Sequence, residues 1–270
     1  MSYERGFLLD IEAHPEDPTP RLILADWLEE HGDPRSDLLR REVEVAEILG
    51  WQNVHGVLSL RRFYGKLDDE VFLQAIQSLP NPHQLKEDAE RCKEEGEHLF
   101  VLYPGLDVRS IRSHADRVYE ERTGEARERG RLMYEQAWYE REQQTFAVTT
   151  HPARYHLVPK EPLFLFDRTW IDLVEFDAQD SRILRPRGFP HSGILLSPER
   201  MNMLLLHEQD TRERLDAKCS LRCLDQAVAG NHVNVGYFGA GGLYVGSGLD
   251  DYYVADFGLA SFREFGTPKT

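Results

Sequence analysis

Three aspartates and one histidine near the carboxyl end of the chain have side chains suited to chemistry. Asp250, Asp251 and Asp256 follow His232 in the sequence. Carboxylates beside a histidine could ligate a divalent ion or act as general acid and base in a hydrolase. The structural alternative is that Asp250 and Asp251 form a turn while Asp256 alternates with inward residues on a strand. These four residues are the catalytic candidates of the sequence.

Residues 252–260, YYVADFGLA, contain an Asp-Phe-Gly triplet behind the glycine-rich stretch GYFGAGGLYVGSG. Protein kinases use both elements, but their glycine loop lies near the start of the domain and a long lobe follows the triplet. Here the loop directly precedes the triplet, only 12 residues follow Gly258, and no V-A-I-K or H-R-D partner occurs. We therefore predict no nucleotide or other cofactor here, and expect the glycines to mark hairpins and bulges.

The cysteines do not form a recognisable metal site. Cys219 and Cys223 stand in CSLRC, with His207 and His232 in the flanking sequence, but C-x3-C without a second cysteine pair does not match zinc frameworks. We predict no bound metal and interpret the two cysteines as apolar packing residues of a helix. With Cys92 they make three cysteines, which is typical of a reducing compartment without disulfides. A cytoplasmic location is therefore expected.

Other enzyme signatures are absent from the sequence. His151 and His156, in HPARYH, are expected to be ordinary loop or strand residues. No G-x-S-x-G, H-E-x-x-H, Walker or Rossmann spacing occurs. The sequence favours a non-enzyme and leaves an enzyme open.

The first 50 residues carry a clear helical pattern. A first apolar stripe at helical spacing ends at the prolines of HPEDPTP. Thr19 then fits an N-cap, with Pro20 at the first helical position. The second helix is predicted to present an apolar face made of Leu22, Ile23, Ala25, Trp27 and Leu28.

Two residues of this unit lead to structural predictions. Trp27 shares a helical face with Ile23, so we expect its indole to anchor the core of the unit. Gly32 stands where a helix ends in a left-handed residue, which lets Asp33 and Pro34 begin a third helix.

The run FLLDIEAHPEDPTPRLILADWLEEHGDPRSDLLR resembles the repeat-companion domain, a short bacterial helical module often found at the N-terminus of proteins with leucine-rich repeats. The resemblance covers residues 3–45 and rests on P-R-L-x-x-A-D-W-L-E-E-x-G-D-P, which matches in residue type and spacing. It implies a module known by its architectural context, with no activity attached. No leucine-rich repeat follows, because the L-x-x-L-x-L-x-x-N period is absent.

The remaining pattern divides the chain near residue 145. Before it, LDDEVFLQAIQSL and NPHQLKEDAERCKEEGEHL predict helices, HLFVLYPG a strand, and residues 107–144 a charge-laced helix. After it come short β-branched and aromatic segments, which predict strands. They are FAVTT, RYHLV, PLFLF, WIDLVEF, GILLS, HVNVGYF, GLYVGS and YYVADF. One long helix is predicted to start at Ser197.

These elements predict an α+β fold. A helical N-terminal half is followed by a mixed, largely antiparallel, β-rich C-terminal half with one long helix. We expect three units: residues 1–50, a helical region 51–145, and an α+β domain 146–270.

Charge excludes some function classes. The formal charge is −15, and residues 1–50 alone hold 13 acidic against 5 basic side chains. A binder of phosphate backbones carries the opposite sign, so direct nucleic-acid binding is not expected. No apolar run approaches the roughly 20 residues of a membrane helix, so no membrane association is expected either.

Three function hypotheses follow. The first is a non-catalytic protein-interaction adaptor, or a regulatory subunit of a larger bacterial assembly, that binds a protein partner. The second is a hydrolase or metal-dependent enzyme that uses the C-terminal aspartates and His232. The third is an acidic mimic of nucleic acid. The interaction surface of the first hypothesis consists of Asp26, Glu29, Glu30, Asp33, Arg35, Asp37 and Arg40, with Arg41 beside them.

Overall fold

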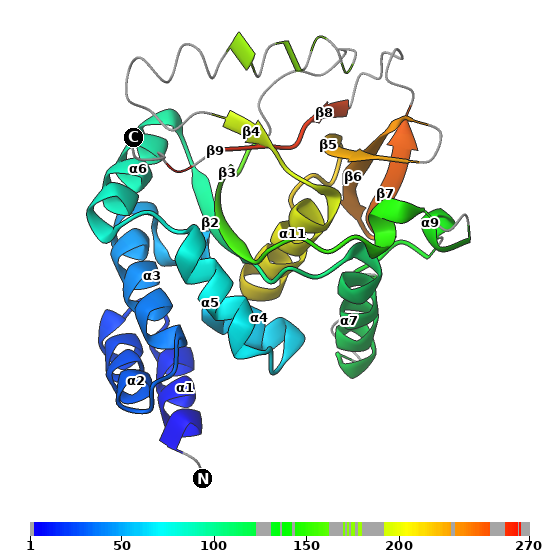
Figure 1. The fold of residues 1–270 in the computed structure, drawn as a ribbon. Coiled ribbons are helices and arrows are strands. Elements are labelled where there is room, and N and C mark those ends of the chain that lie inside the picture. Colours follow the sequence, from blue (N-terminus) through cyan, green and yellow to red (C-terminus); the bar gives the residue numbers. More distant parts are fainter. Residues whose placement is uncertain are drawn as a thin grey trace.

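The computed structural model describes most of the chain. The described residues are 3–122, 131–135, 137–141, 144–161, 170, 172, 174–175, 178–179, 192–227, 230–248, 257–263 and 265. In Figure 1 the N-terminal part of the chain, coloured blue to cyan, is mostly helical, and most strands belong to the later part, coloured green to red.

Three helices form the N-terminal unit: α1 (Tyr3–Ala13), α2 (Pro18–Glu30) and α3 (Arg35–Leu49). The N-cap of α2 is Asp17, whose side chain accepts a hydrogen bond from the Thr19 N–H, so the prediction of Thr19 as the cap is wrong. Asp17 takes this role because the helix already begins at Pro18, two residues earlier than the sequence pattern indicates.

Further helices surround the sheets. They are α4 (Val57–Tyr64), α5 (Asp69–Ser78), α6 (Pro82–Glu95), α7 (Val108–Glu121), α9 (Trp138–Arg141) and α11 (Ser197–Thr211). Two short 3-10 turns are η1 (Trp51–Asn53) and η2 (Thr145–Val148).

A five-stranded sheet has the order β1-β2-β3-β9-β4. Its strands are β1 (Val54–His55), β2 (His98–Tyr103), β3 (Arg154–Pro159), β4 (Ser192–Ile194) and β9 (Ser261–Arg263). β1 and β2 are parallel, and the other pairs are antiparallel. All six residues of β2 are buried, which places this strand in the centre of the core.

A second sheet of four strands has the order β7-β6-β5-β8. Its members are β5 (Ser220–Gln226), β6 (His232–Gly239), β7 (Gly242–Gly248) and β8 (Phe257–Leu259). β5 and β8 are parallel, while β5–β6 and β6–β7 are antiparallel.

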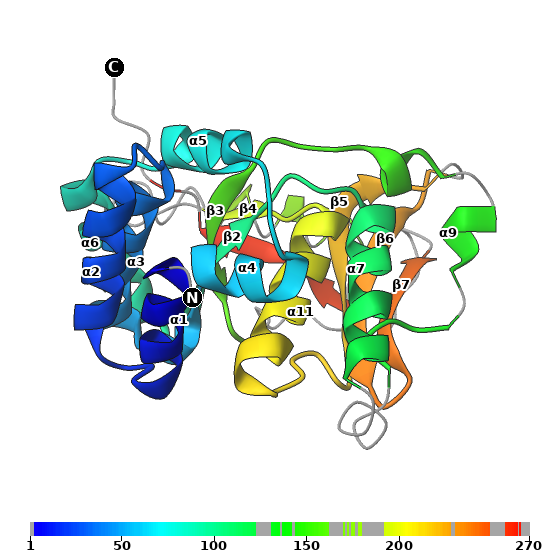
Figure 2. The ribbon, with the colours of Figure 1, turned by 90° about the horizontal axis from the view of Figure 1, so that it is seen from below.

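Helix α11 joins the two sheets. Every residue from Ser197 to Glu208 is buried, and the helix contacts β1 and β2 on one side and β5 and β6 on the other. Figures 1 and 2 both show it between the sheets, with α4 and α7 alongside. A helix covered on all sides needs apolar residues around most of its circumference, and MNMLLL provides them except for Asn202, which is hydrogen-bonded to Leu102 O and to the Tyr64 hydroxyl.

The predicted α+β class, with helices first and strands later, is confirmed. Two predicted strands are wrong: FAVTT forms the turn η2, and the described residues of WIDLVEF, among them Trp170 and Asp172, are helical. Aromatic and β-branched residues fit either element in short runs, so tertiary packing decides. PLFLF and most of YYVADF lie outside the described residues. The unit boundaries stay a prediction, while the five-stranded sheet takes strands from both sides of residue 145.

No helix in the described part of the chain combines the length and the hydropathy needed to cross a bilayer.

Candidate functional site

The outer side of α2 carries Asp26, Glu29 and Glu30 of the predicted interaction surface. One side of the helix buries Leu24, Ala25 and Leu28 in the core. On the other side, Ile23 is 46% exposed and Leu22 38% exposed. Three exposed carboxylates continue this side toward the end of the helix. We call Leu22, Ile23, Asp26, Glu29 and Glu30 the α2 face.

Arginines of α3 hold some of these carboxylates. Arg40 donates to Asp26 Oδ1 at 2.8 Å and to Glu29 Oε2 at 2.6 Å. Arg35 contacts Asp33 instead, at the start of α3. The structure thus brings Asp26, Glu29 and Arg40 together and places Asp33 with Arg35 in a second group.

The other predicted surface residues lie around these two groups. Glu30 and Asp37 are exposed. Arg41 points to the rest of the chain, since its Nη1 donates to the Pro80 carbonyl at 2.8 Å.

Trp27 packs against the core but is only half-buried, so the prediction that it is a main anchor of the core is wrong. Its ring packs against Phe7 with 6.4 Å between centroids and against His31 with 4.2 Å. The buried core positions of α2 are held by Leu24 and Leu28, which are 2% and 1% exposed. The helix is rotated so that Trp27 lies at the edge between the core and the α2 face.

The prediction for Gly32 is confirmed. Its φ is +69°, in the left-handed region. Gly32 N donates to Glu29 O at 2.9 Å and Asp33 N donates to Leu28 O at 2.9 Å, which is the Schellman pattern. These bonds end α2 and turn the chain into α3.

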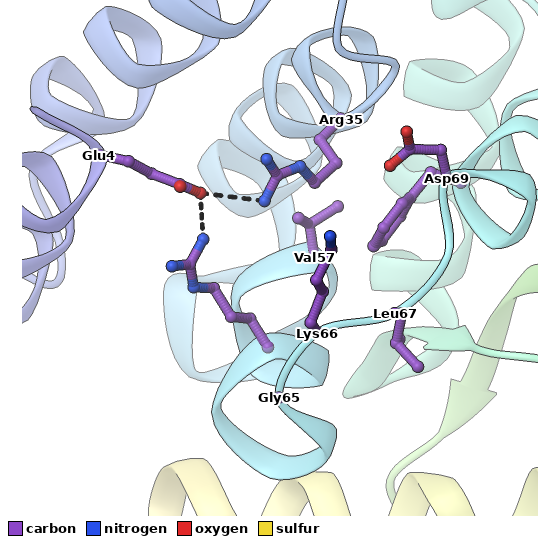
Figure 3. A pocket seen from close by; sticks show the side chains of 9 residues that line it. Glu4, Arg35, Val57, Gly65, Lys66, Leu67 and Asp69 are labelled. Carbon is purple, nitrogen blue, oxygen red and sulfur yellow. Dashed lines mark hydrogen bonds and ion pairs between the residues drawn. The ribbon is translucent and has the colours of Figure 1, made fainter. Parts of the chain in front are cut away.

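A first pocket of about 330 Å³ lies where α1, α3 and α4 meet. Figure 3 shows Glu4 reaching from α1 toward Arg35 of α3. Glu4 Oε1 accepts from Arg35 Nη1 at 3.0 Å and also from Arg61 of α4. One carboxylate therefore sits between two guanidinium groups and fixes α1 to the two neighbouring helices.

A second pocket, of about 400 Å³, lies on the other side of α4. We call it the Arg21 pocket. Its wall includes Arg21 of α2, Trp51 of η1, Arg62 of α4 and Asp210 of α11, and the buried Glu42 of α3 also lines it. Segments far apart in the sequence therefore share one concave surface.

Glu42 is 5% exposed and is held at fixed geometry. Its Oε1 accepts a hydrogen bond from the Val57 N–H at 2.8 Å and another from the Tyr155 hydroxyl. A Cβ at position 56 would lie 1.8 Å from the same oxygen, so Gly56 is required by this close approach. Burial raises the pKa of Glu42 to about 7, although both hydrogen bonds oppose the change.

A row of hydrogen-bonded side chains, here called the polar chain, leads from the Arg21 pocket through buried histidines to the exposed Glu213. His55 Nδ1 lies 2.9 Å from Asp210 Oδ2, and His55 Nε2 lies 2.9 Å from His207 Nδ1. His207 Nε2 then lies 3.0 Å from Glu213 Oε2. Ser59 adds a hydrogen bond from its hydroxyl to Asp210.

The proton position on His207 follows from its lowered pKa and from its acceptor, Glu213. Burial and, next, the neighbouring His55 lower the pKa of His207 to about 4, so His207 carries one ring proton at neutral pH. Because Glu213 accepts, that proton lies on His207 Nε2, and His207 Nδ1 accepts from His55 Nε2. His55 Nδ1 faces the Asp210 carboxylate, so the His55 ring connects His207 to Asp210.

The residues of the polar chain are not those that the sequence offered as catalytic candidates. Asp250, Asp251 and Asp256 lie outside the described residues. His232 in β6 is 5% exposed, and its ring stacks on Trp170 with 3.6 Å between centroids.

The histidines of HPARYH are in the expected elements. His151 lies in the loop before β3, and His156 lies in β3. His156 Nε2 is 3.3 Å from Glu199 Oε1.

Cys219 and Cys223 are not helical, contrary to the prediction for CSLRC. Cys219 precedes β5, and Cys223 is buried within it, where desolvation raises the pKa of its thiol. The segment is a strand because β5 pairs with β6 and β8. A five-residue sequence motif carries no information about this pairing. Within the ranges that the structure describes, no group of three or more His, Cys, Asp or Glu side chains is arranged to hold a metal ion.

Sequence reasoning missed the polar chain and Glu42. A signal existed for Glu42, since it occupies the buried stripe of α3 between Leu38, Leu39 and Ala46, where a carboxylate is out of place. No local signal links His55 to His207, because 152 positions separate them.

Comparison of the chain with family models, curated proteins and solved structures found no match. The resemblance of residues 3–45 to the repeat-companion domain stays a prediction.

Proposed function

We propose that the protein is a non-catalytic interaction adaptor, or a regulatory subunit of a larger bacterial assembly, and that it docks through the α2 face. The partner is a protein with a basic patch next to an apolar contact. The free thiols of all three cysteines fit the cytoplasm as the place where it acts.

One observation carries this proposal: the α2 face joins exposed apolar side chains to exposed carboxylates on one surface. Ile23 and Leu22 offer apolar area for a partner, while Asp26 and Glu30 follow on the same side of the helix. Apolar contacts support affinity, and complementary charges steer the encounter.

The position of the carboxylates is a further argument. Glu29 and Glu30 are the last two residues of α2, whose last turn has no basic residue. Negative charge at a helix C-terminus opposes the macrodipole and is unfavourable by about 0.3–1 kcal/mol. The helix macrodipole therefore does not account for this pair; Glu29 is held by Arg40, and the exposed Glu30 supports a role in recognition.

The arginines of α3 favour an adaptor over a mimic of nucleic acid. Arg40 neutralises part of Asp26 and Glu29, and Arg35 pairs with Asp33. A polyanion mimic needs carboxylates that stay uncompensated along one face.

The test is a double charge reversal, Glu29→Lys with Glu30→Lys, in the full chain. Proteins captured by the wild type from its host are identified, one is purified, and its association rate with both chains is measured. We expect the reversal to slow association at low salt, and the difference to shrink at high salt because screening weakens the contact.

A matched control exists on α7. Glu120→Lys with Glu121→Lys changes the same charges at the last two residues of another helix, on the opposite side of the molecule (Figure 1). Equal slowing by both double variants would show a general charge effect and exclude the α2 face as the docking surface. Unchanged association of the α2 variant at low salt would do the same.

A further inference from the structure

The Arg21 pocket has the chemistry of a ligand site separate from the α2 face. Its volume of about 400 Å³ lies within the range of small-molecule pockets. Two guanidinium groups, one indole ring and one serine hydroxyl line it beside Glu42 and Asp210.

Arg21 is partly buried and uses few of its donors inside the protein. Its guanidinium lies over the Trp51 ring, 4.3 Å from the centroid, and Nη1 donates to the Asp17 carbonyl at 3.2 Å. Desolvation lowers the pKa of Arg21; Glu42 opposes this change, and the positive charge of Arg62 adds to it. Two like charges thus face the same pocket, and an anion between them would relieve the repulsion.

Arg62 forms an ion pair with Asp210, and this carboxylate has other partners. Arg62 Nη1 is 3.3 Å from Asp210 Oδ1, while Asp210 Oδ2 accepts from His55 and Ser59. The Asp210 carboxylate is thus shared among Arg62, His55 and Ser59 and does not serve Arg62 alone. Since the raised pKa of Glu42 keeps part of this carboxyl neutral at pH 7, positive charge prevails at the inner wall, and Glu16 adds a carboxylate at the exposed rim.

The first pocket contains a comparable pair of arginines, and there both are neutralised by one carboxylate. There Arg35 and Arg61 share the Glu4 carboxylate (Figure 3). Arg61 and Arg62 are neighbours on α4 and face different pockets. In the described part of the chain, no carboxylate bridges Arg21 and Arg62 by contacts like those of Glu4.

We propose that the Arg21 pocket binds a small organic anion, whose carboxylate or phosphate oxygens lie between the guanidinium groups of Arg21 and Arg62. Arginine forks match both kinds of oxyanion. Ser59 and the protonated form of Glu42 provide hydrogen bonds to the remainder of the ligand, and Trp51 provides an apolar wall.

The experiment titrates the full chain at low salt with inorganic phosphate and, in a second arm, with malonate. Heat of binding is measured by calorimetry, and the emission of Trp51 is isolated by comparison with Trp51→Phe. We expect saturable binding of at least one anion, and the arm that binds assigns the oxyanion class. Arg21→Met and Arg62→Gln should each weaken it about tenfold or more.

The matched control is Arg61→Gln, on the same helix but facing the first pocket. It should keep the affinity within about twofold of the wild type. Arg21→Lys keeps the positive charge but lacks the paired N–H donors of the guanidinium, so it should bind with intermediate affinity. It provides a second test of this position if Arg21→Met does not fold. The proposal would be overturned if neither anion shows saturable binding up to about 10 mM. Equal losses of affinity in Arg61→Gln and Arg62→Gln would also overturn it.

Discussion

His55 of β1 and Asp210 of α11 are 155 positions apart in the sequence, and His55 Nδ1 lies 2.9 Å from Asp210 Oδ2. The His55 side chain is 1% exposed and that of Asp210 13%. This contact ties the end of the central helix to the edge of the five-stranded sheet. It also connects the Arg21 pocket to the polar chain.

We predict that Asp210→Asn lowers the free energy of unfolding by about 3 kcal/mol, because it removes a buried carboxylate whose Oδ2 is hydrogen-bonded to His55 and Ser59. The control is Asp10→Asn, which removes an aspartate–histidine pair of similar length, Asp10–His14 at 3.1 Å, whose side chains are 55% and 62% exposed. An exposed pair contributes little, so this variant should change stability by less than about 0.5 kcal/mol. Urea unfolding compares the two, and equal losses would contradict the assigned role of burial.

Local sequence patterns predict the elements that rest on local physics. The stop at Gly32 follows from the need for a left-handed residue, and the strand His98–Tyr103 follows from its continuous apolar run. The helix after Ser197 has its proline and glutamate in the first turn. In each case the information lies within a few residues.

The pockets and the polar chain could not be predicted in this way. Arg21, Arg62 and Asp210 come together only through the packing of α2, α4 and α11. Periodicity identifies which side of a helix is apolar, but not which other helix covers it. Trp27 illustrates a smaller error of this kind, since a rotation of α2 places its ring at the edge of the core.

The half-buried position of Trp27 leads to a second prediction. Trp27→Ala should lower the free energy of unfolding by about 2 kcal/mol, through loss of the ring contacts with Phe7 and His31. Leu28→Ala removes a side chain that is 1% exposed and should lower it by about 3–4 kcal/mol. Thermal or chemical unfolding gives the order, and a larger loss for Trp27→Ala would show that the indole is the main anchor after all.

A third prediction separates backbone strain from crowding at Gly32. Nothing lies within 4 Å of a Cβ built there, so the effect of Gly32→Ala comes from its φ of +69°. It should destabilise the protein by about 1 kcal/mol. Gly6 lies within α1 with equally open space, and Gly6→Ala should instead stabilise by about 0.5–1 kcal/mol through helix propensity. Opposite signs in paired melting curves are expected, and stabilisation by both would refute the strain.

The last prediction concerns the buried carboxyl of Glu42. Its pKa is raised by burial from 4.5 to about 7, so between these pH values the folded protein binds a proton that the unfolded chain has released. The contribution of Glu42 to stability is therefore fully present below pH 4.5, falls as the pH rises, and changes no further above about pH 7.

Glu42→Gln removes this titration and keeps an oxygen that can accept from Val57 and Tyr155. Relative to the wild type, the variant should gain about 2–3 kcal/mol in unfolding free energy between pH 4.5 and pH 7.5. Urea unfolding of both proteins across this range measures the difference, which cancels the titration of other groups. Glu44→Gln, at an exposed position of the same helix, should give a difference that does not change with pH. Parallel profiles for the wild type and Glu42→Gln would mean that Glu42 is ionised in the folded protein throughout, and that the hydrogen bonds from Val57 and Tyr155 outweigh its desolvation.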